Sequence, residues 1–154
     1  MRHPSAHPQY ATRINFINWA LRIGAIELVP RELKSGRISP YYFNSGLFNT
    51  GHTLSTLVQE YTKVIHLNFN PDVIFGPAYK GIPLVAGVAI ALGNSVGYAF
   101  NRKEEKAHGE GGILAGSPLE GKKVLIIDDV MTTGTSSGEA VEIIRANGGT
   151  PLAV

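Results

Sequence analysis

Two adjacent carboxylates, Asp128 and Asp129, stand at the end of an apolar run over 124–128 that has the character of a buried strand. Ionised carboxylates are pure hydrogen-bond acceptors, so this pair can accept from two neighbouring sugar hydroxyls or hold Mg²⁺ indirectly. A loop of small and hydroxyl residues follows and leads into a helical pattern, and N–H groups at the start of a helix bind anions. Acids and amides together predict a site for a ribose phosphate. The loop consists of Val130, Met131, Thr132, Thr133, Gly134, Thr135 and Ser136.

The elements that must position these residues follow an α/β rhythm. Apolar periodicity predicts helices over 10–22, from 54 onward, over 82–92 and over 134–147, and strands over 73–75, 96–100, 124–128 and 152–154. Strands that alternate with helices indicate a parallel sheet, and such sheets bind ligands at the carboxyl edge of their strands. We expect the strand over 124–128 to be the centre of the sheet. Short antiparallel strands are expected over 26–50 instead.

Composition narrows the class of protein. The chain has 154 residues, which suits one domain over 1–154, and its 44% hydrophobic and 17% charged residues exclude a disordered or fibrous chain. A net charge of +2 is too small to argue for nucleic acid or for an anionic membrane. There is no cysteine, and no apolar run reaches the length of about 18 residues that a membrane span needs. We therefore expect a soluble cytoplasmic protein.

Two further loops carry groups that suit a polyphosphate. Tyr79 and Lys80 lie on a glycine-bounded turn, 76–81, that follows a predicted strand. The polar segment 101–112 places several cationic side chains between two predicted strands. By itself each loop could be an ordinary solvated turn, and charged runs in proteins usually are solvated surface segments. Their place in a phosphate-binding fold favours function. The cationic residues are Arg102, Lys103, Lys106 and His108.

These four segments together resemble a known family. Residues 124–136 resemble the phosphoribosyl diphosphate (PRPP) signature of type I phosphoribosyltransferases. Three further segments resemble parts of the orotate phosphoribosyltransferases. The pyrophosphate loop of that family resembles residues 75–83, and its mobile catalytic loop resembles residues 100–112. Its N-terminal hood resembles residues 33–51. The resemblance implies a central parallel sheet flanked by helices, with a small hood over about 26–50.

The resemblance also implies a reaction. Enzymes of this family transfer the phosphoribosyl group from PRPP to orotate, which gives orotidine 5'-monophosphate and pyrophosphate in pyrimidine (UMP) biosynthesis. Mg²⁺ arrives with PRPP and is held mainly by its diphosphate oxygens, so no residue is expected to ligate it directly. The catalytic loop closes over the active site of a partner subunit, which implies a homodimer.

Individual roles follow from the same resemblance. Lys106 and His108 act on the pyrophosphate in the transition state, and Lys34 contacts PRPP. Tyr42 and Phe43 line the orotate site. Thr132 is a further candidate for contact with orotate, and a cis peptide bond is implied between Ala78 and Tyr79. Arg102, Lys103, Tyr79 and Lys80 are expected to contact the pyrophosphate group.

One departure from the family keeps alternatives open. The family's chain continues beyond the strand that starts at Leu152, with an arginine-containing segment that helps to bind orotate. This sequence therefore resembles a C-terminally truncated member, and an exposed strand edge predicts poor stability or aggregation. A non-catalytic PRPP-binding module and an inactive fragment remain alternatives to the enzyme. Purine phosphoribosyltransferases are disfavoured by the hood aromatics and by the 102–112 pattern.

Overall fold

A computed structural model describes residues 8–32, 36–93, 96–104 and 112–154. The chain forms two compact units, residues 1–53 and residues 54–154. Helix α2 (Gly51–Asn68) begins in the first unit and continues into the second. Within the described ranges, no helix combines the length and apolar character that crossing a membrane requires.

The first unit contains one helix and two short antiparallel strand pairs. Helix α1 (Pro8–Arg22) is followed by Gly24, whose positive φ of 75° suits the end of a helix. Strand β1 (Ile26–Glu27) pairs with β4 (Tyr42–Phe43), and β2 (Arg31–Glu32) pairs with β3 (Ile38–Ser39). The antiparallel strands expected over 26–50 are thus present, and the short 3₁₀ helix η2 (Ser45–Leu47) follows them.

Aromatic side chains form the packed face of this unit. The Phe16 and Phe48 rings stack with centroids 6.5 Å apart, and Trp19 and Phe43 each lie 5.8 Å from Phe48. Ile14 and Ile17 stand at helical spacing in the sequence, yet both are exposed. The helix therefore packs its aromatic residues, Phe16 and Trp19, which are half-buried, because large rings remove more apolar area from water.

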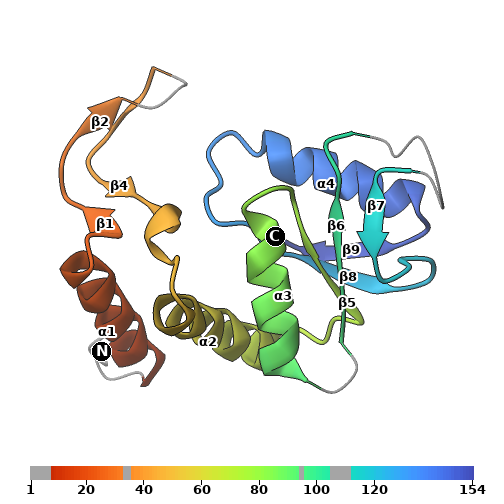
Figure 1. Cartoon of the computed structure of the whole chain (residues 1–154), viewed down its shortest axis with the longest axis horizontal. Coiled ribbons are helices and arrows are strands. Elements are labelled where there is room, and N and C mark those ends of the chain that lie inside the picture. Colours follow the sequence, from red (N-terminus) through yellow and green to blue (C-terminus); the bar gives the residue numbers. More distant parts are fainter. Residues whose placement is uncertain (1–7, 33–35, 94–95, 105–111) are drawn as a thin grey trace, which may run out of the picture. The chain divides into compact units, whose positions relative to one another are not determined.

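The second unit is built around a five-stranded sheet (Figure 1). Its order is β7-β6-β5-β8-β9, parallel except for the antiparallel β6–β7 pair. The strands are β5 (Val73–Gly76), β6 (Gly97–Asn101), β7 (Leu114–Gly116), β8 (Lys123–Ile126) and β9 (Thr150–Ala153). This is the α/β sheet that the sequence predicts.

Two details of the sheet differ from the sequence prediction. Strand β7 was not expected, because Leu114–Gly116 has no alternation of its own and becomes a strand only by pairing with β6. The added edge strand makes β5 the middle strand of the described sheet. The expectation that the strand carrying the acids is central is therefore wrong, since β8 lies one place further out.

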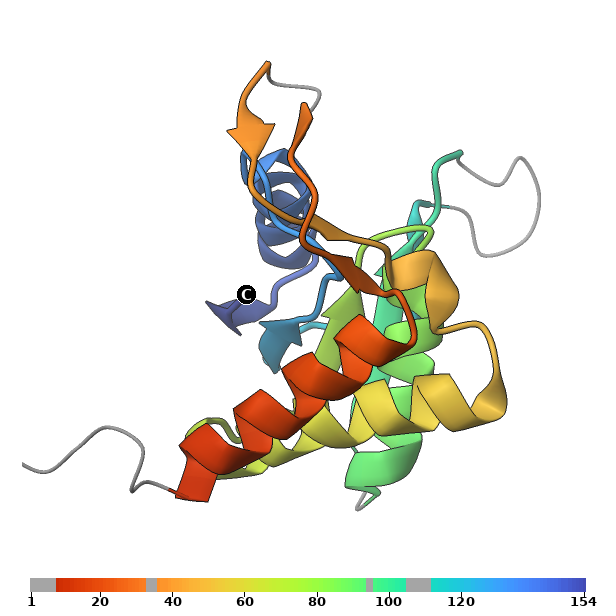
Figure 2. The same cartoon turned by 90° about the vertical axis from the view of Figure 1, so that its left-hand side faces the viewer.

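Helices cover both faces of the sheet (Figures 1 and 2). Helix α4 (Thr135–Ala146) packs over β8 and β9, and α3 (Gly81–Leu92) packs over β5 and β6 on the opposite face. Successive side chains of a strand point to opposite faces of the sheet. In β5, Val73 and Phe75 belong to the cluster under α4, and the intervening Ile74 is fully buried on the other face. The cluster under α4 consists of Val73, Phe75, Ala99, Leu119, Val124, Ile126, Ala140 and Ile144.

Candidate active site

The two acids, called here the acid pair, lie where β8 ends. Ile127 is buried, and its N–H donates to the carbonyl of Phe75 at 2.8 Å, so the chain stays attached to β5 beyond the regular ladder. Asp128 and Asp129 follow, both half-buried. The Asp129 N–H donates to Asp128 Oδ1 at 2.9 Å, which holds the turn between them. Both carboxylates are thus fixed at the carboxyl edge of the sheet.

The acid pair carries its charge in an unfavourable environment. Burial raises the pKa of the Asp128 carboxyl above its ordinary value, and the charge of Asp129 acts in the same direction. Hydrogen bonds from the Asp129 N–H and from Ser136 oppose this rise, because they stabilise the ionised form. A ligand that brings hydroxyl donors or a cation would relieve the repulsion between the two acids.

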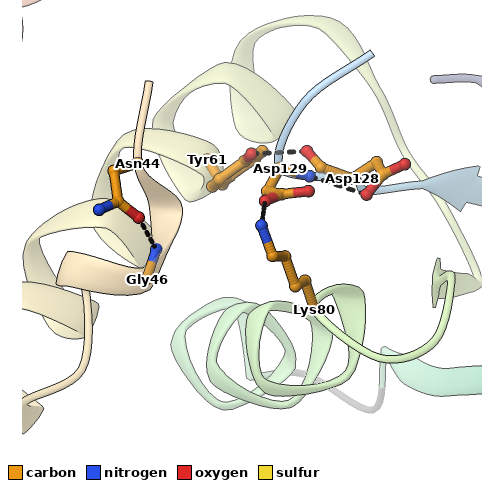
Figure 3. A network of polar contacts seen from close by, with 6 residues as sticks. All are labelled: Asn44, Gly46, Tyr61, Lys80, Asp128 and Asp129. Atoms are coloured by element: carbon orange, nitrogen blue, oxygen red, sulfur yellow. Dashed lines mark hydrogen bonds and ion pairs between the residues drawn. The ribbon is translucent and has the colours of Figure 1, made fainter. Parts of the chain in front are cut away.

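Tyr61 on α2 supports the backbone of the acid pair (Figure 3). Its hydroxyl donates to the carbonyl oxygen of Asp128 at 2.8 Å. Burial, with the nearby charges of Asp129 and Asp128, raises the pKa of Tyr61 to about 12, so the phenol stays protonated and remains a donor at neutral pH. Helix α2 thereby anchors the turn that presents the acids.

Lys80 reaches the acid pair from the neighbouring strand end. Its Nζ lies 3.2 Å from Asp129 Oδ2, and Figure 3 shows this ion pair beside the Tyr61 contact. The Lys80 side chain is 69% exposed whereas that of Asp129 is 9% exposed. A largely buried carboxylate is therefore matched by a cation whose side chain is mostly exposed to solvent.

The loop 77–80 that carries Lys80 has an unusual backbone. The peptide bond between Ala78 and Tyr79 is cis, as the resemblance implies. Gly76 and Gly81 flank the loop so closely that a Cβ on Gly76 would collide with the Gly81 carbonyl. The Ala78 N–H donates to the side-chain oxygen of Asn101 at 2.9 Å, which ties this loop to the end of β6.

Residues 130–136, called here the anion loop, connect β8 to the start of α4. Gly134 has a φ of 79°, a conformation that suits glycine, and the helix begins at the next residue. The Thr133 and Thr135 hydroxyls lie 3.0 Å apart. Thr132 and Ser136 are also exposed, so several hydroxyls and the first amides of α4 face solvent at one helix N-terminus. This arrangement suits a phosphate group.

Only the start of the cationic segment 101–112 lies in the described residues. The Arg102 N–H is bonded to the Ile113 carbonyl at 2.6 Å, and Lys103 is exposed. Lys103 helps to line a cavity of about 240 Å³ between this segment, the loop 77–80 and α4. Its remaining walls are Pro77, Ala78, Asn101, Thr135, Ser136, Glu139, Ala140 and Ile143.

Comparisons with known proteins agree with this geometry. The profile of the phosphoribosyl transferase domain family matches residues 48–151. An orotate phosphoribosyltransferase of Acinetobacter baumannii is 53% identical over 95% of this chain and 67% of its own length. One from Bordetella pertussis is 51% identical over 94% of this chain and 67% of its own length. The chain belongs to the orotate phosphoribosyltransferase family.

A solved structure supports the same conclusion. The orotate phosphoribosyltransferase of Francisella tularensis superposes with a TM-score of 0.75 at 42% sequence identity, over 90% of this chain and 69% of that one. The type I phosphoribosyltransferase fold expected from the sequence is thus confirmed. The chain spans about two thirds of the length of these orotate phosphoribosyltransferases.

The structure brings together several of the predicted residues of the second unit. Lys80 meets Asp129, and Lys103, Thr135 and Ser136 line one cavity. Tyr79 is 69% exposed beside this group. Three predicted residues, Lys34, Lys106 and His108, lie outside the described residues.

Two predicted residues of the orotate phosphoribosyltransferase hood lie in the first unit. Tyr42 and Phe43 form β4 and are half-buried. Phe43 packs against Phe48, and the Arg31 guanidinium lies 4.4 Å above the centre of the Tyr42 ring. Arg31 also forms an ion pair with Glu27 at 2.8 Å. Both aromatics are therefore packed, which is compatible with the wall of a pocket.

Sequence reasoning missed two residues of the site, Tyr61 and Asn101. Tyr61 stands at an apolar position of the helix predicted from 54 onward, and nothing in the neighbouring sequence indicates a partner 67 positions later. Asn101 immediately precedes two cations, Arg102 and Lys103, and the sequence prediction assigned functions only to these charged residues. Its place at the predicted end of a strand was the signal that could have identified it.

Proposed function

We propose that this chain transfers the phosphoribosyl group of PRPP to orotate, which forms orotidine 5'-monophosphate and pyrophosphate in pyrimidine biosynthesis. The observation that carries this proposal is a curated orotate phosphoribosyltransferase that is 53% identical over 95% of the chain. The geometry agrees with it, because the acid pair, the anion loop and Lys80 meet at the carboxyl edge of one sheet.

The ribose 5-phosphate part of PRPP would bind to β8 and α4. Asp128 and Asp129 would accept hydrogen bonds from the two ribose hydroxyls. The amides and hydroxyls of the anion loop would hold the 5-phosphate, with the positive end of α4 adding to the attraction.

The pyrophosphate group would bind to cations from two loops. Lys80 with Tyr79 would approach it from the loop 77–80, and Arg102 with Lys103 from the start of the cationic segment. Lys106 and His108 would then stabilise the charge that develops as the C1–oxygen bond breaks and orotate nitrogen bonds to C1. Such preorganised charge stabilisation is the main means of catalysis for a group transfer of this kind.

The base would be held by the first unit. Tyr42 and Phe43 would present aromatic surface and backbone amides to flat, anionic orotate, and Lys34 would contact PRPP. We also propose a homodimer in which the segment 102–112 reaches the active site of the partner.

Mg²⁺ is part of this proposal as a companion of PRPP. When bound, it would neutralise diphosphate charge. The acid pair would offer carboxylate oxygens to the water molecules bound to Mg²⁺ and would not ligate the ion directly. Among the described residues no group of three or more His, Cys, Asp or Glu side chains is placed to hold a metal. The two carboxylates of the acid pair suit an ion that the diphosphate oxygens of PRPP would chiefly hold. A cytoplasmic location is proposed as well, supported by the lack of cysteine in the sequence.

The test is a direct assay of turnover. Loss of orotate absorbance is followed with PRPP and Mg²⁺ for the unmodified chain, for Lys106→Ala, and for the unmodified chain with a chelator. We expect turnover by the unmodified chain, a loss of at least 100-fold in Lys106→Ala because a transition-state contact is removed, and no turnover with the chelator.

The same assay separates the alternatives. PRPP binding without turnover by the unmodified chain would favour a non-catalytic PRPP-binding module. Neither binding nor turnover would favour an inactive fragment. Turnover with adenine or hypoxanthine instead of orotate would move the chain to the purine enzymes.

A further inference from the structure

Asn101 joins two loops that are distant in sequence. Its side-chain oxygen accepts the N–H of Ala78 at 2.9 Å, across 23 residues of sequence, and the contact is partly buried. The donor belongs to the loop that carries Lys80. The acceptor is the last residue of β6, immediately before Arg102 and Lys103. One hydrogen bond thus connects the loop that carries Lys80 with the start of the cationic segment.

The Asn101 end of this bond is firmly held. Its backbone is paired with Leu114 in the antiparallel β6–β7 ladder, and the next N–H, that of Arg102, is bonded to the Ile113 carbonyl. Parallel pairing of β6 with β5 holds the other side of the strand. The side chain therefore projects from a backbone that pairs with β7 at Asn101 itself and with β5 as far as the preceding residue, Phe100.

The Ala78 end leads to the acid pair. Two residues after Ala78, Lys80 reaches Asp129 at 3.2 Å, so the contacts run from β6 through the loop 77–80 to the end of β8. Asn101 and Ala78 both line the cavity of about 240 Å³ that Lys103 and the start of α4 complete. The two bonded residues thus form part of the wall of a cavity that Lys103 also lines.

We infer that Asn101 is a positioning residue for the pyrophosphate group of PRPP. It holds the Ala78 amide so that Lys80 faces the acid pair, and it keeps this loop in register with Arg102 and Lys103. This inference rests on the proposed function, since it concerns the diphosphate half of the same site. It distinguishes Asn101 from the residues that hold ribose 5-phosphate, which lie on β8 and α4.

A pair of ligands and a pair of variants test the inference. Calorimetry measures binding of PRPP with Mg²⁺, and of ribose 5-phosphate, to the unmodified chain, to Asn101→Ala and to Asn147→Ala. Asn147 is the matched control, because its side chain also makes one bond to a backbone group, the Ile143 carbonyl at 2.8 Å, but at the far end of α4. We expect PRPP affinity to fall about tenfold in Asn101→Ala alone, with ribose 5-phosphate affinity unchanged in both variants.

A double-mutant cycle shows whether Asn101 acts through Lys80. If it does, Asn101→Ala combined with Lys80→Ala binds PRPP no more weakly than Lys80→Ala alone, because the group to be positioned is already gone. Losses that multiply, or an equal loss of PRPP and ribose 5-phosphate affinity, would overturn the inference in favour of a general structural role.

The remaining outcomes separate this inference from the proposed function. An unmodified chain that binds PRPP, together with an Asn101→Ala chain that binds it equally well, overturns the inference and leaves the proposed function intact. An unmodified chain that binds no PRPP overturns both.

Discussion

At the scale of single residues, the charge of Asp128 suits the proposed function but lowers the stability of the folded protein. Its burial and the adjacent Asp129 charge raise its pKa, so the folded protein binds a proton at this carboxyl more readily than the unfolded chain does. Ionisation at neutral pH therefore lowers the free energy of unfolding. The proposed binding of ribose hydroxyls needs ionised acids, so the proposed function lowers the stability of the protein when no substrate is bound.

Asp128→Asn should therefore stabilise the protein and impair its function. The amide keeps an oxygen acceptor for the Asp129 N–H but removes the buried charge. We expect a higher melting temperature at pH 7 and a large loss of PRPP affinity. The difference in melting temperature should shrink as pH falls through the raised pKa, because the unmodified carboxyl then becomes neutral in the folded state. Thermal unfolding at pH 7 and below pH 4 checks this, and a less stable variant at pH 7 would contradict it.

Tyr61→Phe should weaken the support of the acid pair. Removing the hydroxyl leaves the Asp128 carbonyl without this donor, and we expect about 1 kcal/mol less stability, with weaker PRPP binding. Tyr98→Phe is the control, since Tyr98 is 42% exposed. Denaturant unfolding and calorimetry measure both effects, and equal behaviour of the two variants would refute the role of Tyr61.

Alkaline pH provides a second measure of Tyr61. Its pKa in the folded protein, about 12, exceeds the ordinary value of 10.0, so the protonated phenol favours the folded state. This contribution is complete below pH 10 and is lost as pH rises toward 12. We expect the unmodified chain to lose more stability than Tyr61→Phe between pH 10 and pH 12. Parallel pH profiles of the two proteins would contradict the raised pKa.

At the scale of elements, α2 and α3 hold the site through close helix packing. A Cβ built on Gly87 of α3 would lie 2.7 Å from Cγ2 of the buried Val58 on α2. Tyr61 is one turn further along α2, so this contact contributes to the placement of its hydroxyl. The glycine is required by the approach of two helices, which a pattern along one segment of sequence does not reveal.

Two glycine-to-alanine substitutions, one at the helix contact and one outside it, should change the free energy of unfolding in opposite directions. Gly87→Ala should cost about 1–3 kcal/mol, because Val58 has no room for the added methyl. Gly138→Ala in α4 meets nothing within 4 Å and should stabilise by up to about 1 kcal/mol through helix propensity. Equilibrium unfolding of both variants is the measurement. A Gly87→Ala variant with unchanged free energy of unfolding would show that α2 and α3 can move apart without a loss of stability.

At the scale of the whole molecule, the sheet of the second unit has an exposed edge at β9. This strand pairs only with β8 in the described sheet, and Leu152 on it is 39% exposed. Unpaired N–H and C=O groups beside an apolar side chain are a template for pairing with another copy. The sequence-based expectation of aggregation therefore has a specific location.

Leu152→Lys should reduce association at this edge. A lysine there introduces charge that opposes strand pairing between copies. Ile90→Lys is the matched control, because it replaces an aliphatic side chain that is 83% exposed on α3, away from β9. Light scattering over a range of concentrations should show less association in Leu152→Lys than in Ile90→Lys. Equal association of the two variants would exclude β9 as the contact.

The sequence by itself determined the acid pair, the anion loop and the order of the elements other than β7, because each of these depends on residues adjacent in the chain. The resemblance to the family implied the cis peptide bond after Ala78, and the structure contains it. Tertiary structure alone decided that β7 joins the sheet, that β5 lies in its middle, and that Lys80 meets Asp129. It also revealed Tyr61 and Asn101, whose partners lie 67 and 23 positions away. The physical reason is that local patterns encode burial and backbone conformation, whereas a hydrogen bond between distant elements exists only once the sheet has brought the strand ends together.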